Sequence, residues 1–146
     1  VLLLDWGLVK VRSEEGAPSD IDDMSSESLT EDPTMTGFQK LQGTIAYMSP
    51  EQIKKAPDID GRTDIYSLGV VLYEALTGVK PSLGDTMDKI KASTLNDIPI
   101  TPSEISTTPI SQVLDDIVMQ CLAKDANKRM QSVGELIRLL KEGLGV

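Results

Sequence analysis

The stretch from Arg62 to Gly78 most constrains how this chain can fold, because it is predicted to form one long helix that is apolar on almost every side. Such a helix belongs in the middle of a domain, since no face of it favours water. Thr63 or Asp60 can cap its start, and Gly78 can end it in a left-handed turn. Apolar residues at helical spacing are Ile65, Leu68, Leu72, Ala75 and Leu76, with Val70, Val71 and Tyr73 opposite.

Asp64 does not fit this apolar pattern. A carboxylate in the first turn of a buried helix is costly unless hydrogen-bond donors meet it. One interpretation is simple stabilisation of the helix dipole. The other is that Asp64 holds another loop in place. Both interpretations stay open at this point.

Composition limits the classes of function. With 146 residues, 40% of them hydrophobic, the chain suits one domain with a real core. A net charge of -9 argues against nucleic acid and anionic membranes as partners. The single cysteine cannot form an intrachain disulfide, and without histidine there is no imidazole chemistry. We expect a cytoplasmic segment, whose parent protein could be anchored in a membrane elsewhere.

The N-terminal part changes character sharply. Val1–Leu4 is an apolar run predicted to form a buried strand, followed by Asp5-Trp-Gly and a brief extended segment. Because the run lacks an initial Met, we expect a piece of a longer protein. From residue 11 to residue 42 the chain is acidic and rich in Ser, Thr and Pro, so it cannot bury enough apolar surface to order itself. This stretch is expected to be a mobile loop inside the domain.

The remainder is predicted to be helical, with caps that mark where helices begin. Ser49 and Pro50 start a short helix, and Ser132 with Glu135 forms a capping-box pattern that starts the last one. The other expectations are a helix over 86–93 with Met87 and Ile90 inward, an irregular stretch over 95–109, a helix over 110–122, a polar turn over 124–130, and inward Leu136, Ile137, Leu139 and Leu140 in the last helix.

Several short motifs follow one another along the chain in a specific order: Asp5-Trp-Gly, then Gly43-Thr-x-x-Tyr-x-Ser-Pro-Glu51, then Asp64-x-x-Ser-Leu-Gly69, then Arg129. This order resembles the C-terminal half of a protein kinase, in particular the bacterial, eukaryotic-like serine/threonine kinases, over nearly the whole chain. The resemblance implies a mainly α fold, a kinase C-lobe fragment with a short N-terminal strand pair and a long activation loop. The resemblance implies a partial kinase domain over 1–142, followed by a tail over 143–146. Within the domain it implies a strand and magnesium-site turn over 1–10, the activation loop over 11–42 and a helical subdomain over 43–142.

The resemblance assigns roles to single residues. Asp5, the candidate catalytic and metal-binding residue, matches the D-F-G aspartate that ligates the magnesium bridging the phosphates of ATP, and a hard cation favours carboxylate oxygen. Trp6 stands where the family usually has Phe, so the larger ring is expected to affect the switch between active and inactive arrangements. Thr34 and Thr36 lie where such kinases are switched by phosphorylation, although Thr in a disordered tract is an equally good interpretation.

Further residues match the substrate loop and its anchors. Gly43, Thr44 and Tyr47 match the loop that receives the peptide, and the Thr44 position favours Ser or Thr acceptors. The resemblance also implies a buried ion pair between Glu51 and Arg129. It assigns Asp64 the role of accepting backbone N–H groups from the catalytic loop, and Tyr66 stands where many members carry Trp.

The implied function is phosphoryl transfer from ATP to protein Ser or Thr in signal transduction. The Gly-rich loop, its lysine and the catalytic loop are absent from this sequence, so the isolated chain is expected to be inactive. Self-association of the complete kinase is a further expectation. The alternatives are a pseudokinase or scaffold lobe, in which the acidic loop would be a docking arm, and a plain helical interaction domain. An upstream H-R-D aspartate and strand lysine would separate enzyme from scaffold.

Overall fold

The long central helix is present as α3 (Arg62–Thr77). Gly78 follows it with a φ of 75°, in the left-handed region, and its N–H donates to the carbonyl of Glu74. Glycine therefore ends the helix as predicted. At the start, Gly61 occupies the N-cap position, and Asp60 Oδ1 accepts the N–H of Arg62 at 2.9 Å. Asp60, one of the two predicted capping residues, thus binds the first turn, although the N-cap position itself belongs to Gly61 and has no side-chain cap hydrogen bond.

The computed structural model describes residues 42–146, which belong to a unit that spans residues 33–146. The expected strand pair and nearly all of the expected activation loop lie outside the described residues. Within 42–146 the regular structure is helical and contains no strand, in agreement with the mainly α prediction.

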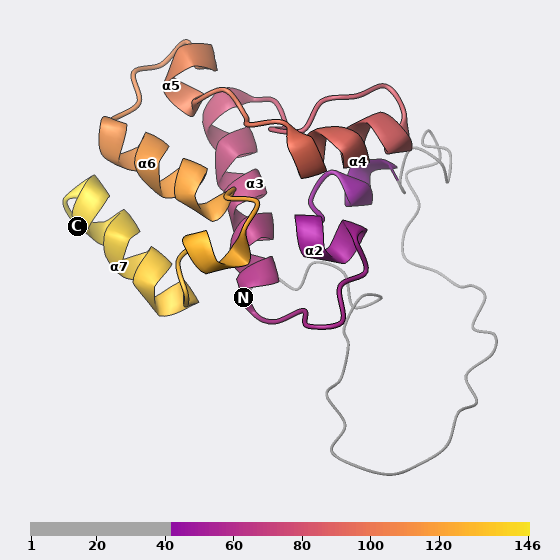
Figure 1. The fold of residues 1–146 in the computed structure, drawn as a ribbon. Coiled ribbons are helices and arrows are strands. Elements are labelled where there is room, and N and C mark those ends of the chain that lie inside the picture. Colours follow the sequence, from indigo (N-terminus) through magenta and orange to yellow (C-terminus); the bar gives the residue numbers. More distant parts are fainter. Residues whose placement is uncertain (1–41) are drawn as a thin grey trace, which may run out of the picture. The chain divides into compact units, whose positions relative to one another are not determined.

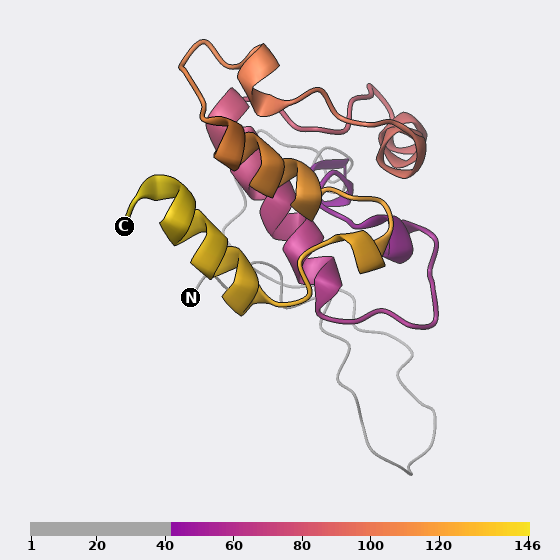
Figure 2. The ribbon, with the colours of Figure 1, turned by 60° about the vertical axis from the view of Figure 1, so that its left-hand side comes forward.

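Figure 1 shows α3 running between two groups of helices. On one side lie α2 (Pro50–Ile53) and α4 (Met87–Asn96), which contact each other. On the other side lie α5 (Pro102–Ile105) and α6 (Gln112–Cys121), both packed on α3. The last helix, α7 (Val133–Leu144), packs on α6, and Figure 2 shows the two helices next to each other.

Side-chain caps explain where these helices begin. Each N-cap hydroxyl accepts a backbone N–H three residues further along the chain, which satisfies one of the unpaired donors of the first turn. In α2 the cap is reciprocal, because the Gln52 side chain also accepts the N–H of Ser49 at 2.9 Å. The caps are Ser49 for α2, Thr86 for α4, Ser111 for α6 and Ser132 for α7.

The core forms around a close contact between α3 and α6 at Gly69. A Cβ atom added to Gly69 would lie 2.5 Å from Cys121 Cβ and 3.2 Å from Leu122 Cδ2, so only glycine fits. Two buried clusters flank this contact, one of Ile65, Ile117, Cys121, Met130 and Leu136, the other of Tyr66, Val70, Tyr73, Val118 and Leu122.

Two predictions of burial were wrong. The central helix is not covered on every side, because Leu68 and Val71 are each 40% exposed and share a stripe with Asp64 and Ala75, which are also exposed. In α7, Ile137 was predicted to face inward but is 49% exposed. The periodic pattern shows which residues are apolar, but it does not show whether another element covers them. Among the described residues no element packs over these side chains.

The segment predicted to be irregular, 95–109, contains a helix, α5, and distant side chains hold it. The buried carboxylate of Asp115 in α6 accepts the N–H of Ser103 at 3.0 Å and also its hydroxyl. The hydroxyl of Tyr73 donates to the carbonyl of Ile100 at 2.9 Å. The predicted polar turn over 124–130 likewise contains a 3-10 helix, η2 (Ala126–Lys128), and ends in buried Met130.

The close contact at Gly69 leads to a stability prediction. Gly69→Ala should destabilise the chain by about 1–3 kcal/mol, because the new methyl group would force α3 and α6 apart. Gly134→Ala is the matched control, because Gly134 is exposed and its added Cβ would meet only Ser132 Oγ at 3.8 Å. The control should be neutral or stabilising by up to about 1 kcal/mol, through helix propensity. Urea denaturation of both variants measures the difference, and equal effects would contradict the assigned contact.

Candidate functional site

Glu51 and Arg129 form a bidentate ion pair between the first turn of α2 and the segment after η2. Arg129 Nη1 lies 2.6 Å from Glu51 Oε1, and Nη2 lies 2.8 Å from Oε2. The exposed fraction of the side chain is 0% for Arg129 and 16% for Glu51. The structure thus brings together the two residues, 78 apart in the chain, for which the resemblance implied an ion pair.

The rest of the Arg129 guanidinium is satisfied by backbone. Nη1 donates to the carbonyl of Arg62 at 2.9 Å, Nε to that of Ala123 at 2.8 Å, and Nη2 to that of Lys124 at 3.3 Å. Together with the carboxylate, these acceptors occupy all five N–H donors that an arginine has. The guanidinium also lies over the ring of Tyr66, 5.0 Å from its centroid.

Hydroxyl groups complete the environment of Glu51. Thr63 Oγ1 donates to Glu51 Oε1 at 2.7 Å, and Ser49 Oγ lies 3.2 Å from Thr63 Oγ1. Burial of the Glu51 carboxyl acts to raise its pKa, but the hydrogen bonds from Arg129 and Thr63 outweigh it and lower the pKa of Glu51 to about 2. The carboxylate is therefore charged over the whole physiological range.

The residues predicted to receive substrate lie directly before α2. Residues 42–45 form a helical turn, and the N–H of Tyr47 donates to the carbonyl of Thr44 at 3.1 Å. Gly43 and Thr44 are both half-buried, and a Cβ on Gly43 would meet nothing within 4 Å. We call residues 43–48 the docking loop.

Tyr47 of the docking loop is fixed from α3 and from the segment after it. Its hydroxyl donates to Glu74, its carbonyl accepts the hydroxyl of Ser67 at 2.8 Å, and Lys80 Nζ lies 5.0 Å from its ring centroid. Burial, together with the hydrogen bond to Glu74, raises the pKa of Tyr47 to about 12. The phenol therefore stays protonated and can keep donating this hydrogen bond at neutral pH.

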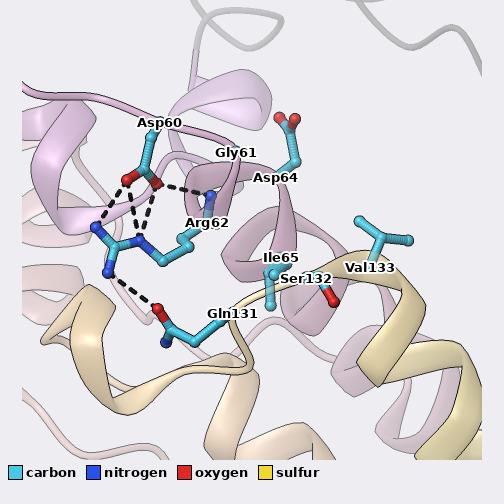
Figure 3. Close-up of a pocket in the computed structure, with 8 residues that line it drawn as sticks. All are labelled: Asp60, Gly61, Arg62, Asp64, Ile65, Gln131, Ser132 and Val133. Carbon is cyan, nitrogen blue, oxygen red and sulfur yellow. Dashed lines mark hydrogen bonds and ion pairs between the residues drawn. The ribbon is translucent and has the colours of Figure 1, made fainter.

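Asp64 lies apart from this network. It is exposed, and Figure 3 shows its carboxylate pointing away from the ion pair of Asp60 and Arg62. A pocket of ≈ 430 Å³ lies here, between the start of α3 and the start of α7. No N–H or side-chain partner for the carboxylate is found among residues 42–146. The catalytic loop that the resemblance assigns to Asp64 is not in this sequence.

The remaining predicted site residues, Asp5, Thr34 and Thr36, lie outside the described residues. Within residues 42–146 no group of three or more acidic, cysteine or histidine side chains could hold a metal ion. None of the helices over these residues is both long enough and apolar enough to cross a bilayer.

A family model described as the protein kinase domain matches residues 2–138. The chain belongs to the protein kinase family. Among curated relatives, serine/threonine-protein kinase PknD of Protochlamydia amoebophila is 37% identical over 141 residues, which cover 94% of this chain and 14% of that protein. Serine/threonine-protein kinase PknB of Mycobacterium leprae is 36% identical over 111 residues, 76% of this chain and 18% of that protein.

The chain thus spans 14% to 18% of the length of these kinases. A solved structure, the twitchin kinase region from C. elegans, is similar with a TM-score of 0.57 and 24% identity, over 66% of this chain and 17% of that one. This structural likeness supports the kinase C-lobe fold, and the relatives' names agree with the resemblance to bacterial serine/threonine kinases.

Sequence reasoning missed the polar side chains of α3 that hold the docking loop and the ion pair. Thr63 was considered only as a helix cap, whereas it donates to Glu51. Ser67 was named only as part of the Asp64-x-x-Ser-Leu-Gly69 motif and Glu74 was not singled out, although both bind Tyr47. The available signal was the presence of polar residues in a helix that is otherwise apolar, since such groups need partners when they are buried.

The lowered pKa of Glu51 predicts how stability changes with pH. Its folded pKa of about 2 lies below the ordinary value of 4.5, so its stabilising contribution is complete above pH 4.5 and is lost as pH falls toward 2. Glu51→Gln should remove the part of the pH dependence of the unfolding free energy that comes from Glu51. It should also destabilise the chain at pH 7 by about 3–5 kcal/mol, because it leaves the buried charge of Arg129 unpaired.

The control is Asp60→Asn, which removes an exposed carboxylate whose hydrogen bonds from Arg62 also lower its pKa to about 2. An exposed pair contributes about 0–1 kcal/mol, so this variant should stay close to the wild type at pH 7. Urea denaturation from pH 3 to pH 7 measures both. If the stability of Glu51→Gln fell with acid as much as that of the wild type, the lowered pKa assigned to Glu51 would be contradicted.

Proposed function

We propose that this chain is part of an enzyme that transfers the γ-phosphoryl group of ATP to Ser or Thr residues of proteins. The observation that carries the proposal is the 37% identity to a serine/threonine-protein kinase over 94% of the chain. The contacts of the docking loop support it, because they hold a short segment rigidly between helices, as a peptide-binding surface requires.

In this proposal the described residues bind and position the acceptor. Gly43, Thr44 and Tyr47 form the surface that receives the peptide. Glu51 and Arg129 fix the C-terminal end of that surface to the late helices through a buried ion pair. Asp64, which is exposed here, anchors the catalytic loop in the complete kinase.

ATP and Mg²⁺ belong to the proposal through Asp5, a carboxylate of the type that magnesium favours. When bound, the metal ion neutralises charge on the phosphate groups. Asp5 lies outside the described residues, and residues 42–146 offer no metal cluster of their own.

The second candidate is a pseudokinase or scaffold lobe that binds a partner protein. The exposed apolar stripe of α3, with Leu68 and Val71 each 40% exposed, is the observation that favours it. Such a lobe would not need Asp5 or Thr44, and both are present. The enzyme is the better supported of the two.

The proposal is tested by comparing the complete kinase that carries this segment with residues 1–146 alone. The complete protein should phosphorylate a generic Ser/Thr substrate in the presence of ATP and Mg²⁺, and Asp5→Asn should abolish the transfer. Residues 1–146 alone should show no transfer above background, because phosphoryl transfer needs all positioning parts together. Radiolabelled ATP measures both. An inactive complete protein that still binds a partner would favour the scaffold.

Thr34 and Thr36 are proposed as the residues whose phosphorylation switches the kinase on. A phosphate adds up to about two negative charges and forms strong pairs with arginine, which orders a loop. We expect mass spectrometry of the autophosphorylated complete kinase to find a phosphate on at least one of the two. Modification of other residues only, in an active enzyme, would remove these positions from the proposal.

A further inference from the structure

The docking loop is packed on α4 as well as on α3. Ile45 and Ala46 of the loop form a buried cluster with Ile90 of α4, with exposed fractions of 5%, 3% and 5%. Met48 of the loop and Met87 of α4 pack against this cluster. The loop therefore presents its apolar side chains to α4.

Tyr47 lies in the middle of these residues, but its contacts are on the other side of the loop. Its hydroxyl and its carbonyl are held by Glu74 and Ser67 of α3. The loop is thus fixed between two helices, by hydrogen bonds to α3 and by apolar packing on α4. Polar contacts set the position of one residue, whereas the packing on α4 sets how the segment around it lies.

The start of α4 is itself held at a fixed distance from the preceding chain. A Cβ atom on Gly84 would lie 2.7 Å from Lys89 Cβ and 2.8 Å from Ile90 N. Backbone atoms cannot move away from such a contact as the end of a flexible side chain can. Any side chain at position 84 would therefore push the first turn of α4, and Ile90 with it, away from its present position.

We propose that Ile90, supported by Met87, is a positioning residue for the protein substrate, which acts by fixing the geometry of the docking loop. This inference rests on the proposed function, because it assigns a role in binding the acceptor peptide. Ile90 does not need to touch the peptide. Its packing on Ile45 and Ala46 determines where Tyr47 and its neighbours meet the acceptor.

The expected signature is a selective loss of acceptor binding. Small displacements of a substrate-positioning segment are costly, and a shift of about 1 Å can lower the rate by up to about a hundredfold. Loosening the contact with α4 should raise the KM for a peptide acceptor, while the KM for ATP stays unchanged. A purely structural role of Ile90 would lower the amount of folded enzyme but leave both KM values alone.

The experiment uses the complete kinase with a matched pair of variants, Ile90→Val and Ile117→Val. Each removes one methylene group from a buried isoleucine, 5% exposed in α4 and 4% exposed in α6. Ile117 belongs to a different cluster, with Ile65 and Leu136, which does not include the docking loop. The third variant, Gly84→Ala, displaces α4 without changing any side chain of the loop cluster.

Steady-state kinetics with a Ser peptide and with ATP give the two KM values, and thermal denaturation gives the stability of each variant. We expect Ile90→Val to raise the peptide KM by about threefold and Gly84→Ala by about tenfold, with the ATP KM unchanged. Ile117→Val should lose similar stability with an unchanged peptide KM. The inference would be overturned if the peptide KM of Ile90→Val and Gly84→Ala equalled that of the wild type, or if Ile117→Val raised the peptide KM as much as Ile90→Val does. A wild-type kinase that phosphorylates no Ser or Thr would instead overturn the proposed function.

Discussion

The structure depends on one buried cation whose every donor has an acceptor. Arg129 has no exposed side-chain surface, and a buried charge of this kind is costly unless it is fully paired. Its acceptors come from α2 through Glu51, from the start of α3 through Arg62, and from the segment after α6 through Ala123 and Lys124. A lysine could not replace it, because an ammonium group has three donors and no planar fork.

The same arrangement explains how the docking loop is held at its C-terminal end, and further contacts hold its middle. Its C-terminal end runs into α2, where Glu51 binds Arg129 and Thr63. Its middle is bound to α3 through Tyr47, and its apolar side chains pack on α4. Because each contact comes from a different helix, the loop has little freedom to move as a unit, and its geometry follows the packing of the helices around it.

The sequence predicted the features that depend on neighbouring residues, and the family resemblance predicted the Glu51–Arg129 pair. The caps at Ser49 and Gly78 follow from local backbone geometry, so they were predicted correctly. Burial depends on which element lies opposite, so periodicity alone placed Leu68 and Ile137 inside when both are exposed. The helix α5 was missed for a related reason, since the buried Asp115 that caps it lies in another helix.

The close approach of α3 and α6 also determines the chemistry of the only cysteine in the chain. Cys121 lies against Gly69 with no exposed surface, and burial raises the pKa of its thiol to about 12. The reactive thiolate is therefore almost absent at neutral pH, and reagents cannot reach the sulfur. Alkylation of this protein should consequently be slow while the helices stay together, so the rate of thiol labelling reports how often α3 and α6 separate.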